Sequence, residues 1–200
     1  MSKNLLLAIG TEDMPANIMA GVVAQLKELC RAKFEENRIS FNEIKIYATP
    51  RRLAVLVKDA ADRQPDEEVK KRGPSIKAAF DENGNPTRAA QGFARGQHID
   101  PSELVKEGDY TWAHVVNRGR AVEDVLPDLF LSLITGLNFT RSMRWADEEA
   151  HFIRPVRWIV ALADDKVIPV EFAHVKSGRV SRGHRFLCKE PVTIERPEDY

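Results

Sequence analysis

The chain has 200 residues, of which 43% are hydrophobic and 30% are charged, and its formal net charge is zero. That composition is ordinary for a soluble globular protein, and the length is enough to bury a substantial core. No apolar run reaches the roughly 18 to 20 residues that cross a bilayer, which excludes a helical membrane protein. The apolar run after Lys3 is too short for a secretory signal, so the expected location is the cytoplasm.

The first third of the chain predicts a strand, a helix and a pair of strands. Residues 5–9 form a short apolar run that is typical of a buried strand. Residues 18–34 repeat apolar side chains with a helical period behind Pro15, which predicts an amphipathic helix built for packing. Residues 44–48 and 53–57 flank a Thr-Pro-Arg-Arg turn, and this pattern indicates paired strands.

The middle of the chain begins with a polar stretch at residues 60–73 that interrupts these apolar patterns. A seam in this stretch would divide the chain into two sub-domains, residues 1–62 and 63–200. Beyond it, residues 88–95 predict a short helix that ends at a glycine, and residues 104–116 predict a hairpin around Glu-Gly-Asp.

The last third of the chain predicts a second long helix and another hairpin. Residues 122–137 repeat apolar side chains with a helical period, and residues 156–163 and 167–172 flank an Asp-Asp-Lys turn. Pro169 places the second of these strands at a sheet edge. Because helices alternate irregularly with hairpins, the predicted fold class is α+β, with mixed or antiparallel sheets from hairpins packed with two longer amphipathic helices.

Several kinds of catalytic motif are missing from the sequence. It has no glycine-rich phosphate loop, dinucleotide fingerprint, paired-histidine metal motif or Gly-x-Ser-x-Gly turn. Cys30 and Cys188 lie too far apart in sequence for a metal or redox motif, and they fit idle thiols in a reducing compartment. Glu12 and Asp13 precede a helix start, where helix capping and the helix dipole account for them. We therefore predict no catalytic residue, no metal site and no bound cofactor.

Basic charge is concentrated near the end of the chain, because residues 141–189 carry ten lysines and arginines against six acidic residues. Seven of those ten are arginines, and they alternate with Trp145, Trp158 and Phe186. Guanidinium groups bind phosphates and aromatic rings stack on unpaired bases, so this segment is suited to an RNA surface. If the aromatic rings are buried instead, the arginines would form internal ion pairs or hold a neighbouring domain. The candidate contacts are Arg144, Arg154, Arg157, Arg182 and Arg185.

Seven short blocks run through the sequence. They are Ile9-Gly10-Thr11-Glu12-Asp13-Met14-Pro15, Thr49-Pro50-Arg51-Arg52-Leu53-Ala54, Lys71-Arg72-Gly73-Pro74, Ala90-Gln91-Gly92-Phe93-Ala94-Arg95, Met143-Arg144-Trp145, residues 152–158 and Gly183-His184-Arg185-Phe186. In this order, the blocks resemble those of the β subunit of the bacterial two-subunit glycyl-tRNA synthetases. The first block departs from that family's usual Ile-Gly-Thr-Glu-Glu-Leu-Pro by having Asp13 and Met14, both conservative exchanges.

The resemblance implies one part of an α2β2 ligase that joins glycine to its tRNA with ATP and Mg²⁺, at a class II site held by the α subunit. This chain would be a non-catalytic N-terminal module of the β subunit that supports recognition of glycine tRNA and assembly. Its partners would be the α subunit, tRNA-Gly and the remainder of the β subunit, with no membrane. Family members are several hundred residues long, and their HD-like and C-terminal anticodon-binding domains are expected to be absent here. The N-terminal part of the family resembles a domain of the phenylalanyl-tRNA synthetase β chain, and the family offers no catalytic residue for any position here.

Two other functions stay open at this point. The chain could be an architectural module that docks the other β domains or the α subunit without touching RNA, which an exposed apolar patch near Trp145 or Trp158 would favour. It could also be a small hydrolytic or editing domain, with His151 or His184 as general base beside a carboxylate. No nucleophile or set of metal ligands accompanies these histidines in the sequence.

Overall fold

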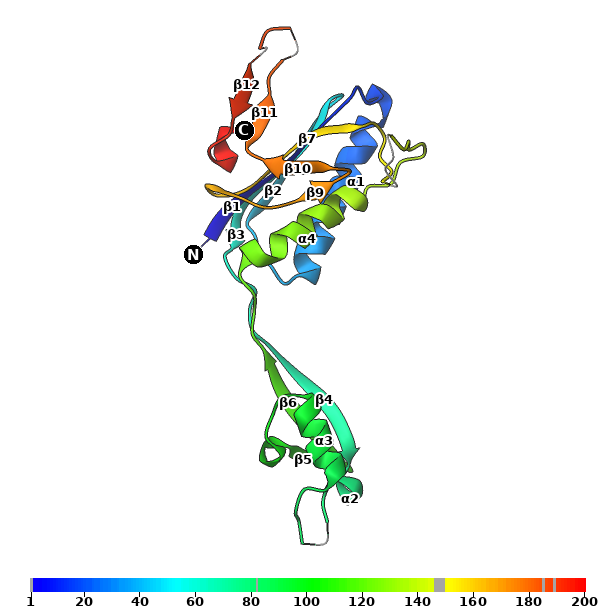
Figure 1. Ribbon diagram of the computed structural model, residues 1–200, viewed down its shortest axis with the longest axis vertical. Coiled ribbons are helices and arrows are strands. Elements are labelled where there is room, and N and C mark those ends of the chain that lie inside the picture. The colour runs from blue at the N-terminus through cyan, green and yellow to red at the C-terminus, as the bar shows by residue number, and fades with distance from the viewer. Residues whose placement is uncertain (1, 82, 146–149, 185, 189) are drawn as a thin grey trace. The chain divides into compact units, whose positions relative to one another are not determined.

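The structure is a computed structural model, and it describes residues 2–81, 83–145, 150–184, 186–188 and 190–200 (Figure 1). By their contacts, the described residues divide into two compact units. The large unit comprises the residues up to 64 together with residues 120–200, and the small unit comprises residues 65–119. The sequence suggested a different division, into sub-domains of residues 1–62 and 63–200, and that division stays a prediction.

The large unit is built on a mixed sheet. Its strands are β1 (Ser2–Thr11), β2 (Glu43–Thr49), β3 (Arg52–Ala61), β7 (Val156–Ala163), β8 (Lys166–Val167), β9 (Glu171–Phe172) and β10 (Val175–Gly178). Within the described residues they form a seven-stranded sheet in the order β2-β3-β1-β7-β10-β9, with β8 paired to β7. Strand β1 is antiparallel to both β3 and β7, whereas β10 is parallel to β7.

Two helices, α1 (Met19–Glu36) and α4 (Val122–Thr135), cover one face of this sheet (Figure 1). A short 3-10 turn, η1 (Ala16–Ile18), leads into α1. Alternate residues of β1 point at the helices and join the main core, together with Leu26 and Phe34 of α1. Phe34 is fully buried, so its replacement by alanine should cost about 3 to 5 kcal/mol of stability.

The other face of the sheet is covered in part by the end of the chain. This end contains β11 (Val180–Arg182), β12 (Pro191–Thr193) and the 3-10 turn η3 (Pro197–Asp199). The remaining alternate residues of β1, Leu6 and Ala8, form a second buried cluster with Ile194, against which Trp158 and Tyr200 pack. Each face of β1 therefore has its own apolar cover.

The small unit has a much smaller core. Its elements are β4 (Glu67–Ser75), α2 (Ile76–Ala79), α3 (Arg88–Gly96), the 3-10 turn η2 (Pro101–Glu103), β5 (Val105–Glu107) and β6 (Tyr110–Asn117). In the described part of this unit the strands form an antiparallel three-stranded sheet in the order β4-β6-β5. Four of the five buried residues in its cluster are alanines, and a Cβ added at Gly73 would overlap the ring of Phe93. Two of the sequence blocks therefore meet at this contact.

The α+β fold class and the two longer amphipathic helices are confirmed. The single strand predicted at residues 167–172 is instead two strands of two residues each, β8 and β9. The physical reason is the proline between them, since Pro169 has no N–H to donate to a ladder. Strand β4 was not predicted, because its sequence is mostly polar and charged. No helix in the described residues is long and apolar enough to cross a membrane.

Candidate nucleic-acid interface

Three of the sequence blocks meet at the end of the large sheet where β1 finishes. The backbone N–H of Thr11 donates to the carbonyl of Arg51 at 2.9 Å, and the N–H of Glu12 donates to the carbonyl of Pro155 at 3.2 Å. We call this region the arginine end. It comprises Glu12, Asp13, Arg51, Arg52, Arg154, Arg157, Trp158 and Arg182.

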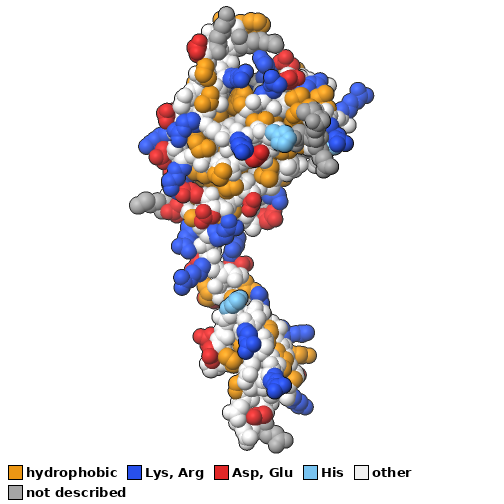
Figure 2. Space-filling view, in the orientation of Figure 1, with side chains coloured by type: hydrophobic (Ala, Val, Ile, Leu, Met, Phe, Trp, Pro, Cys, Tyr) orange, Lys and Arg blue, Asp and Glu red, His pale blue; other side chains and the backbone are white. Residues whose placement is uncertain are grey.

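Two ion pairs at the arginine end are exposed and loosely held. Arg157 lies 3.7 Å from Glu12, and Arg51 lies 3.5 Å from Asp13, with all four side chains at least 44% exposed. Exposed pairs of this kind contribute about 0 to 1 kcal/mol to stability. Figure 2 shows basic and acidic side chains mixed over the visible surface of the large unit. These arginines can therefore exchange a carboxylate for another anion at little cost in stability.

Arg154 is held more firmly than its neighbours. Its Nε donates to the backbone carbonyl of Asp13 at 3.0 Å, and its NH1 group donates to the carbonyl of Ile153 at the same distance. The side chain is half-buried and ties the loop after β1 to the segment that precedes β7. A guanidinium has five N–H donors, so this arginine keeps donors beyond the two that hold the loop.

Arg52 is positioned by a cluster of packed groups. Its NH2 group donates to the carbonyl of Arg182 at 2.7 Å, and its guanidinium lies 5.8 Å from the centre of the Trp158 ring. Trp158 in turn lies flat against Gly10, where an added Cβ would overlap the indole. Tyr200 is largely buried in the same cluster, and burial raises the pKa of its hydroxyl while Arg52 opposes the rise. This packing links β1, β3, β7 and β11.

The remaining predicted arginines differ in how they relate to this packed cluster, which Arg182 joins through its backbone carbonyl. Arg182 and Arg144 are both exposed, and Arg144 lies one residue after Met143, which bridges to Phe152 through the backbone. Arg185 lies outside the residues that the structure describes. The structure thus brings together Arg154, Arg157 and the backbone of Arg182, and it adds Arg51 and Arg52, which the sequence did not single out as site residues.

The three aromatic residues of the arginine-rich segment differ in exposure. Trp145 packs against the main core 6.3 Å from the ring of Phe172, and Trp158 packs against the second cluster. Phe186, in contrast, is 75% exposed, and Leu187 beside it is 86% exposed. The two tryptophans are therefore held in the fold, whereas the tip of the β11–β12 hairpin presents apolar side chains to solvent.

Comparison with known proteins gives the chain a family. A family model described as Glycyl-tRNA synthetase beta subunit matches residues 5–200. The chain belongs to this family. The match covers all seven sequence blocks, including the three that form the arginine end.

The names of similar proteins support the same family. The chain is 47% identical to the "Glycine--tRNA ligase beta subunit" of Desulfitobacterium hafniense strain Y51, over 100% of this chain and 29% of that protein. It is 47% identical to the protein of the same name from Citrifermentans bemidjiense, over 97% of this chain and 29% of that protein. With that of Natranaerobius thermophilus it shares 45% identity over 100% of this chain and 29% of that protein. The chain thus spans 29% of the length of these curated relatives.

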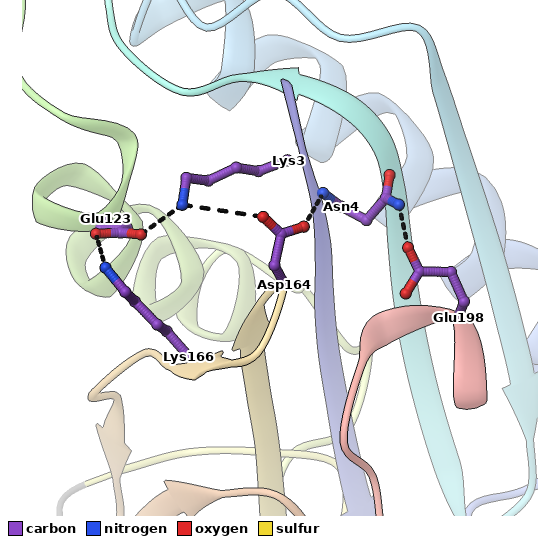
Figure 3. Close-up of polar contacts among 6 residues, drawn as sticks. All are labelled: Lys3, Asn4, Glu123, Asp164, Lys166 and Glu198. Carbon is purple, nitrogen blue, oxygen red and sulfur yellow. Dashed lines mark hydrogen bonds and ion pairs between the residues drawn. The ribbon is translucent and has the colours of Figure 1, made fainter. Parts of the chain in front are cut away.

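A second polar cluster lies at the opposite end of β1 (Figure 3). Glu123, in the first turn of α4, accepts from Lys3 at 2.6 Å and from Lys166 at 3.0 Å. Asp164 accepts from the backbone N–H of Asn4 at 2.9 Å, and the Asn4 side chain donates to Glu198. The cluster therefore joins β1, α4, the β7–β8 turn and η3.

The charges in this second cluster shift the pKa values of its members in the stabilising direction. The hydrogen bonds from Lys3 and Lys166 lower the pKa of Glu123, and the Glu123 carboxylate raises the pKa of Lys3 despite partial burial. Such reciprocal shifts are those of a structural ion-pair network. No substrate is needed to explain them.

The hydrolytic hypothesis finds little support in the geometry. Within the described residues, no three His, Cys, Asp or Glu side chains come together as metal ligands. His184 accepts a hydrogen bond from the Phe186 N–H at 3.3 Å, and no described carboxylate bonds to His184 or His151. Burial raises the pKa of the Cys30 thiol to about 12, which keeps it in the unreactive protonated form.

Proposed function

We propose that this chain is a non-catalytic N-terminal module of the β subunit of an α2β2 glycine–tRNA ligase in the cytoplasm. In this role it supports recognition of glycine tRNA and assembly of the enzyme during ATP-dependent glycyl-tRNA synthesis. Its partners are the α subunit, tRNA-Gly and the remainder of the β subunit. The names of the relatives support both the reaction and the presence of another subunit.

One structural observation supports contact with tRNA. At the arginine end, the guanidinium groups of Arg51 and Arg157 are exposed and loosely paired, and Arg52 is fixed against Trp158 beside them. Guanidinium groups are suited to phosphate oxygens because they offer parallel N–H donors. A fixed arginine with exposed neighbours is thus able to hold an RNA backbone without a large ordering cost.

ATP and Mg²⁺ are assigned to the α subunit in this proposal. This assignment follows the resemblance to the family, in which the α subunit holds the aminoacylation site. The role proposed for this chain is to bind and orient the RNA while the chemistry proceeds elsewhere.

A second candidate function is a purely architectural docking module that does not contact RNA. The observation in its favour is the hairpin tip, where Phe186 and Leu187 are strongly exposed. Exposed apolar patches can mark sites of contact with another protein. Trp145 and Trp158 do not support this function, because both pack against cores of the large unit.

A titration separates these two functions. The complete β subunit, together with its α subunit, is titrated with fluorescent tRNA-Gly at two salt concentrations, with an unrelated tRNA as control. The same titration is repeated with the double variant Phe186→Ser, Leu187→Ser. If the chain contacts tRNA as proposed, the two serines should leave tRNA affinity unchanged, and replacement of Arg157 should weaken it. If only the serine variant changes the complex, by releasing the α subunit, the architectural function is the correct one.

A further inference from the structure

A pocket of about 260 Å³ lies on the large unit between α1 and the segment that follows α4. Its apolar lining comes from Ile18 at the end of η1, from Val22 in the first turn of α1, from Phe139, and from Ile153. Val22 and Ile153 are buried parts of the main core, so this wall of the pocket is fixed. Ligand pockets for whole drug-sized molecules span roughly 300 to 1,000 Å³, so this pocket is suited to a smaller group.

Neutral hydrogen-bonding groups from Asn17, Gln25 and Thr140 also line the pocket. Gln25 accepts from the backbone N–H of Asn138 at 2.7 Å and donates to the Asn138 carbonyl at 3.3 Å, which fixes its amide. Among the described residues, no side chain or backbone group hydrogen-bonds to the Asn17 or Thr140 side chain. The pocket therefore combines an apolar wall with the Asn17 amide and the Thr140 hydroxyl, which are available to a ligand.

The charges lie beside the pocket and not in it. None of the described residues that line the pocket is acidic or basic. Arg154 follows Ile153 directly, and its guanidinium donates to the Ile153 carbonyl oxygen at 3.0 Å. Arg141 follows Thr140 directly and is exposed. An uncharged ring in the pocket would thus have guanidinium groups close to whatever is attached to it.

This distribution matches the chemistry of a nucleotide. A nucleobase has flat apolar faces and an edge of uncharged donors and acceptors, and it is joined through its sugar to a phosphate. Asparagine and glutamine amides pair with base edges, and arginine binds phosphates. We propose that this pocket receives one unpaired base of an RNA strand whose phosphates lie along the arginine end. The inference rests on the proposed function and adds a base contact to its phosphate contacts.

Two glycines allow a matched pair of variants. Gly21 lines the pocket on α1, and Gly92 lies on α3 in the small unit, and an added Cβ at either position would meet no atom within 4 Å. Gly21→Leu should fill the pocket, whereas Gly92→Leu makes the same change of residue type elsewhere. Leucine favours a helix more than glycine does, so neither change should destabilise its helix.

The test uses the complete β subunit with its α subunit and two probes of equal length and charge. One probe is a short single-stranded RNA oligomer, and the other is its abasic counterpart, which keeps the phosphates and lacks the bases. Stacking and edge contacts to one base should make the first probe bind roughly 5- to 150-fold more tightly than the second. Gly21→Leu should remove most of that preference without changing the affinity for the abasic probe, and Gly92→Leu should leave both affinities unchanged.

Three outcomes would overturn the inference, and each is distinct from a failure of the proposed function. A base preference that survives Gly21→Leu would show that the base binds elsewhere. Equal affinity of the wild-type complex for both probes would show phosphate contact without a base site, which leaves the proposed function intact. A Gly21→Leu complex that loses its α subunit but keeps its RNA affinity would make the pocket a protein contact. If neither probe binds the wild type at low salt, the proposed function itself fails.

Discussion

The two ends of the large sheet hold their charged side chains in different ways. Where β1 begins, Glu123 lies 2.6 Å from Lys3 and 3.0 Å from Lys166, and the Glu123 and Lys3 side chains are 27% and 22% exposed. At the arginine end the two ion pairs, at 3.5 and 3.7 Å, are longer than either pair of Glu123, and neither of them has a partner as shielded as Glu123 or Lys3. Short, shielded pairs stabilise a fold, whereas long, exposed ones contribute little and leave donors for a ligand. The comparison suggests a structural end and a binding end on one sheet.

Among variants at the two ends of the sheet, the largest expected effect comes from Gly10→Ala, which breaks the packing that fixes Arg52. The added methyl group would overlap the Trp158 indole, so the core must shift, at a cost of about 1 to 3 kcal/mol. Urea unfolding of the chain measures this loss. Gly21→Ala is the control, since the methyl group there meets no atom within 4 Å. Equal stability of the two variants would show that Trp158 is not packed as described.

Glu123→Gln should produce the next largest effect, because it removes the carboxylate that pairs with Lys3 and Lys166. The expected loss is about 1 kcal/mol in the free energy of unfolding. Its control is Glu28→Gln, which removes a 3.3 Å pair with Arg31 on the exposed surface of α1 and should cost less than about 0.5 kcal/mol. If both changes cost the same, the two ends of the sheet do not differ in the way proposed.

The ionisation of the Glu123 carboxylate should also make the stability of the fold depend on pH. The pKa of Glu123 is lowered from its ordinary value of 4.5, so its stabilising contribution is present above that value and is lost as the pH falls through the lowered pKa. The pKa of Lys3 is raised from 10.5, so its contribution is present below that value and is lost as the pH rises through the raised pKa. Unfolding curves from pH 2 to 7 should therefore fall less steeply in acid for Glu123→Gln.

Arg154→Ala and Arg157→Ala should differ in their effect on stability, although both residues lie at the arginine end. Arg154→Ala removes two hydrogen bonds to backbone carbonyls and should cost about 1 kcal/mol of stability. Arg157→Ala removes a single exposed pair and should change stability by less than about 0.5 kcal/mol. Thermal unfolding of the two variants side by side measures the difference. A larger loss for Arg157→Ala would assign it the structural role instead.

The fold class and most elements could be predicted from local patterns in the sequence. The helical periods at residues 18–34 and 122–137 gave α1 and α4 to within a few residues, since apolar spacing is a local property. The pairing of β1 with β7 could not be predicted, because it joins residues about 150 positions apart and no turn connects them. Polar β4 was missed for a related reason, since its pairing with β6 and not its own composition makes it a strand.

The candidate site was predicted in part. The arginine-rich segment drew attention to Arg154 and Arg157, and whether any of its arginines contacts RNA stays a prediction. Arg51 and Arg52 were missed because they lie about 100 residues earlier, in a block that looked like an ordinary turn. The signal that could have found them is their position, since both arginines lie inside one of the blocks that resemble the family. Three of these blocks come together only in the folded structure, through backbone hydrogen bonds made by residues 11–14.

The salt dependence of tRNA binding tests directly whether the arginine end holds RNA phosphates. The complete enzyme is compared with its Arg157→Ala, Arg182→Ala double variant and with Arg31→Ala, whose side chain is 54% exposed on α1. Each phosphate contact contributes roughly 0.7 to 0.9 to the slope of log affinity against log salt. The double variant should bind more weakly, with a slope reduced by up to about twice that amount, while Arg31→Ala should match the wild type. A double variant with the wild-type slope and affinity would contradict phosphate binding at the arginine end.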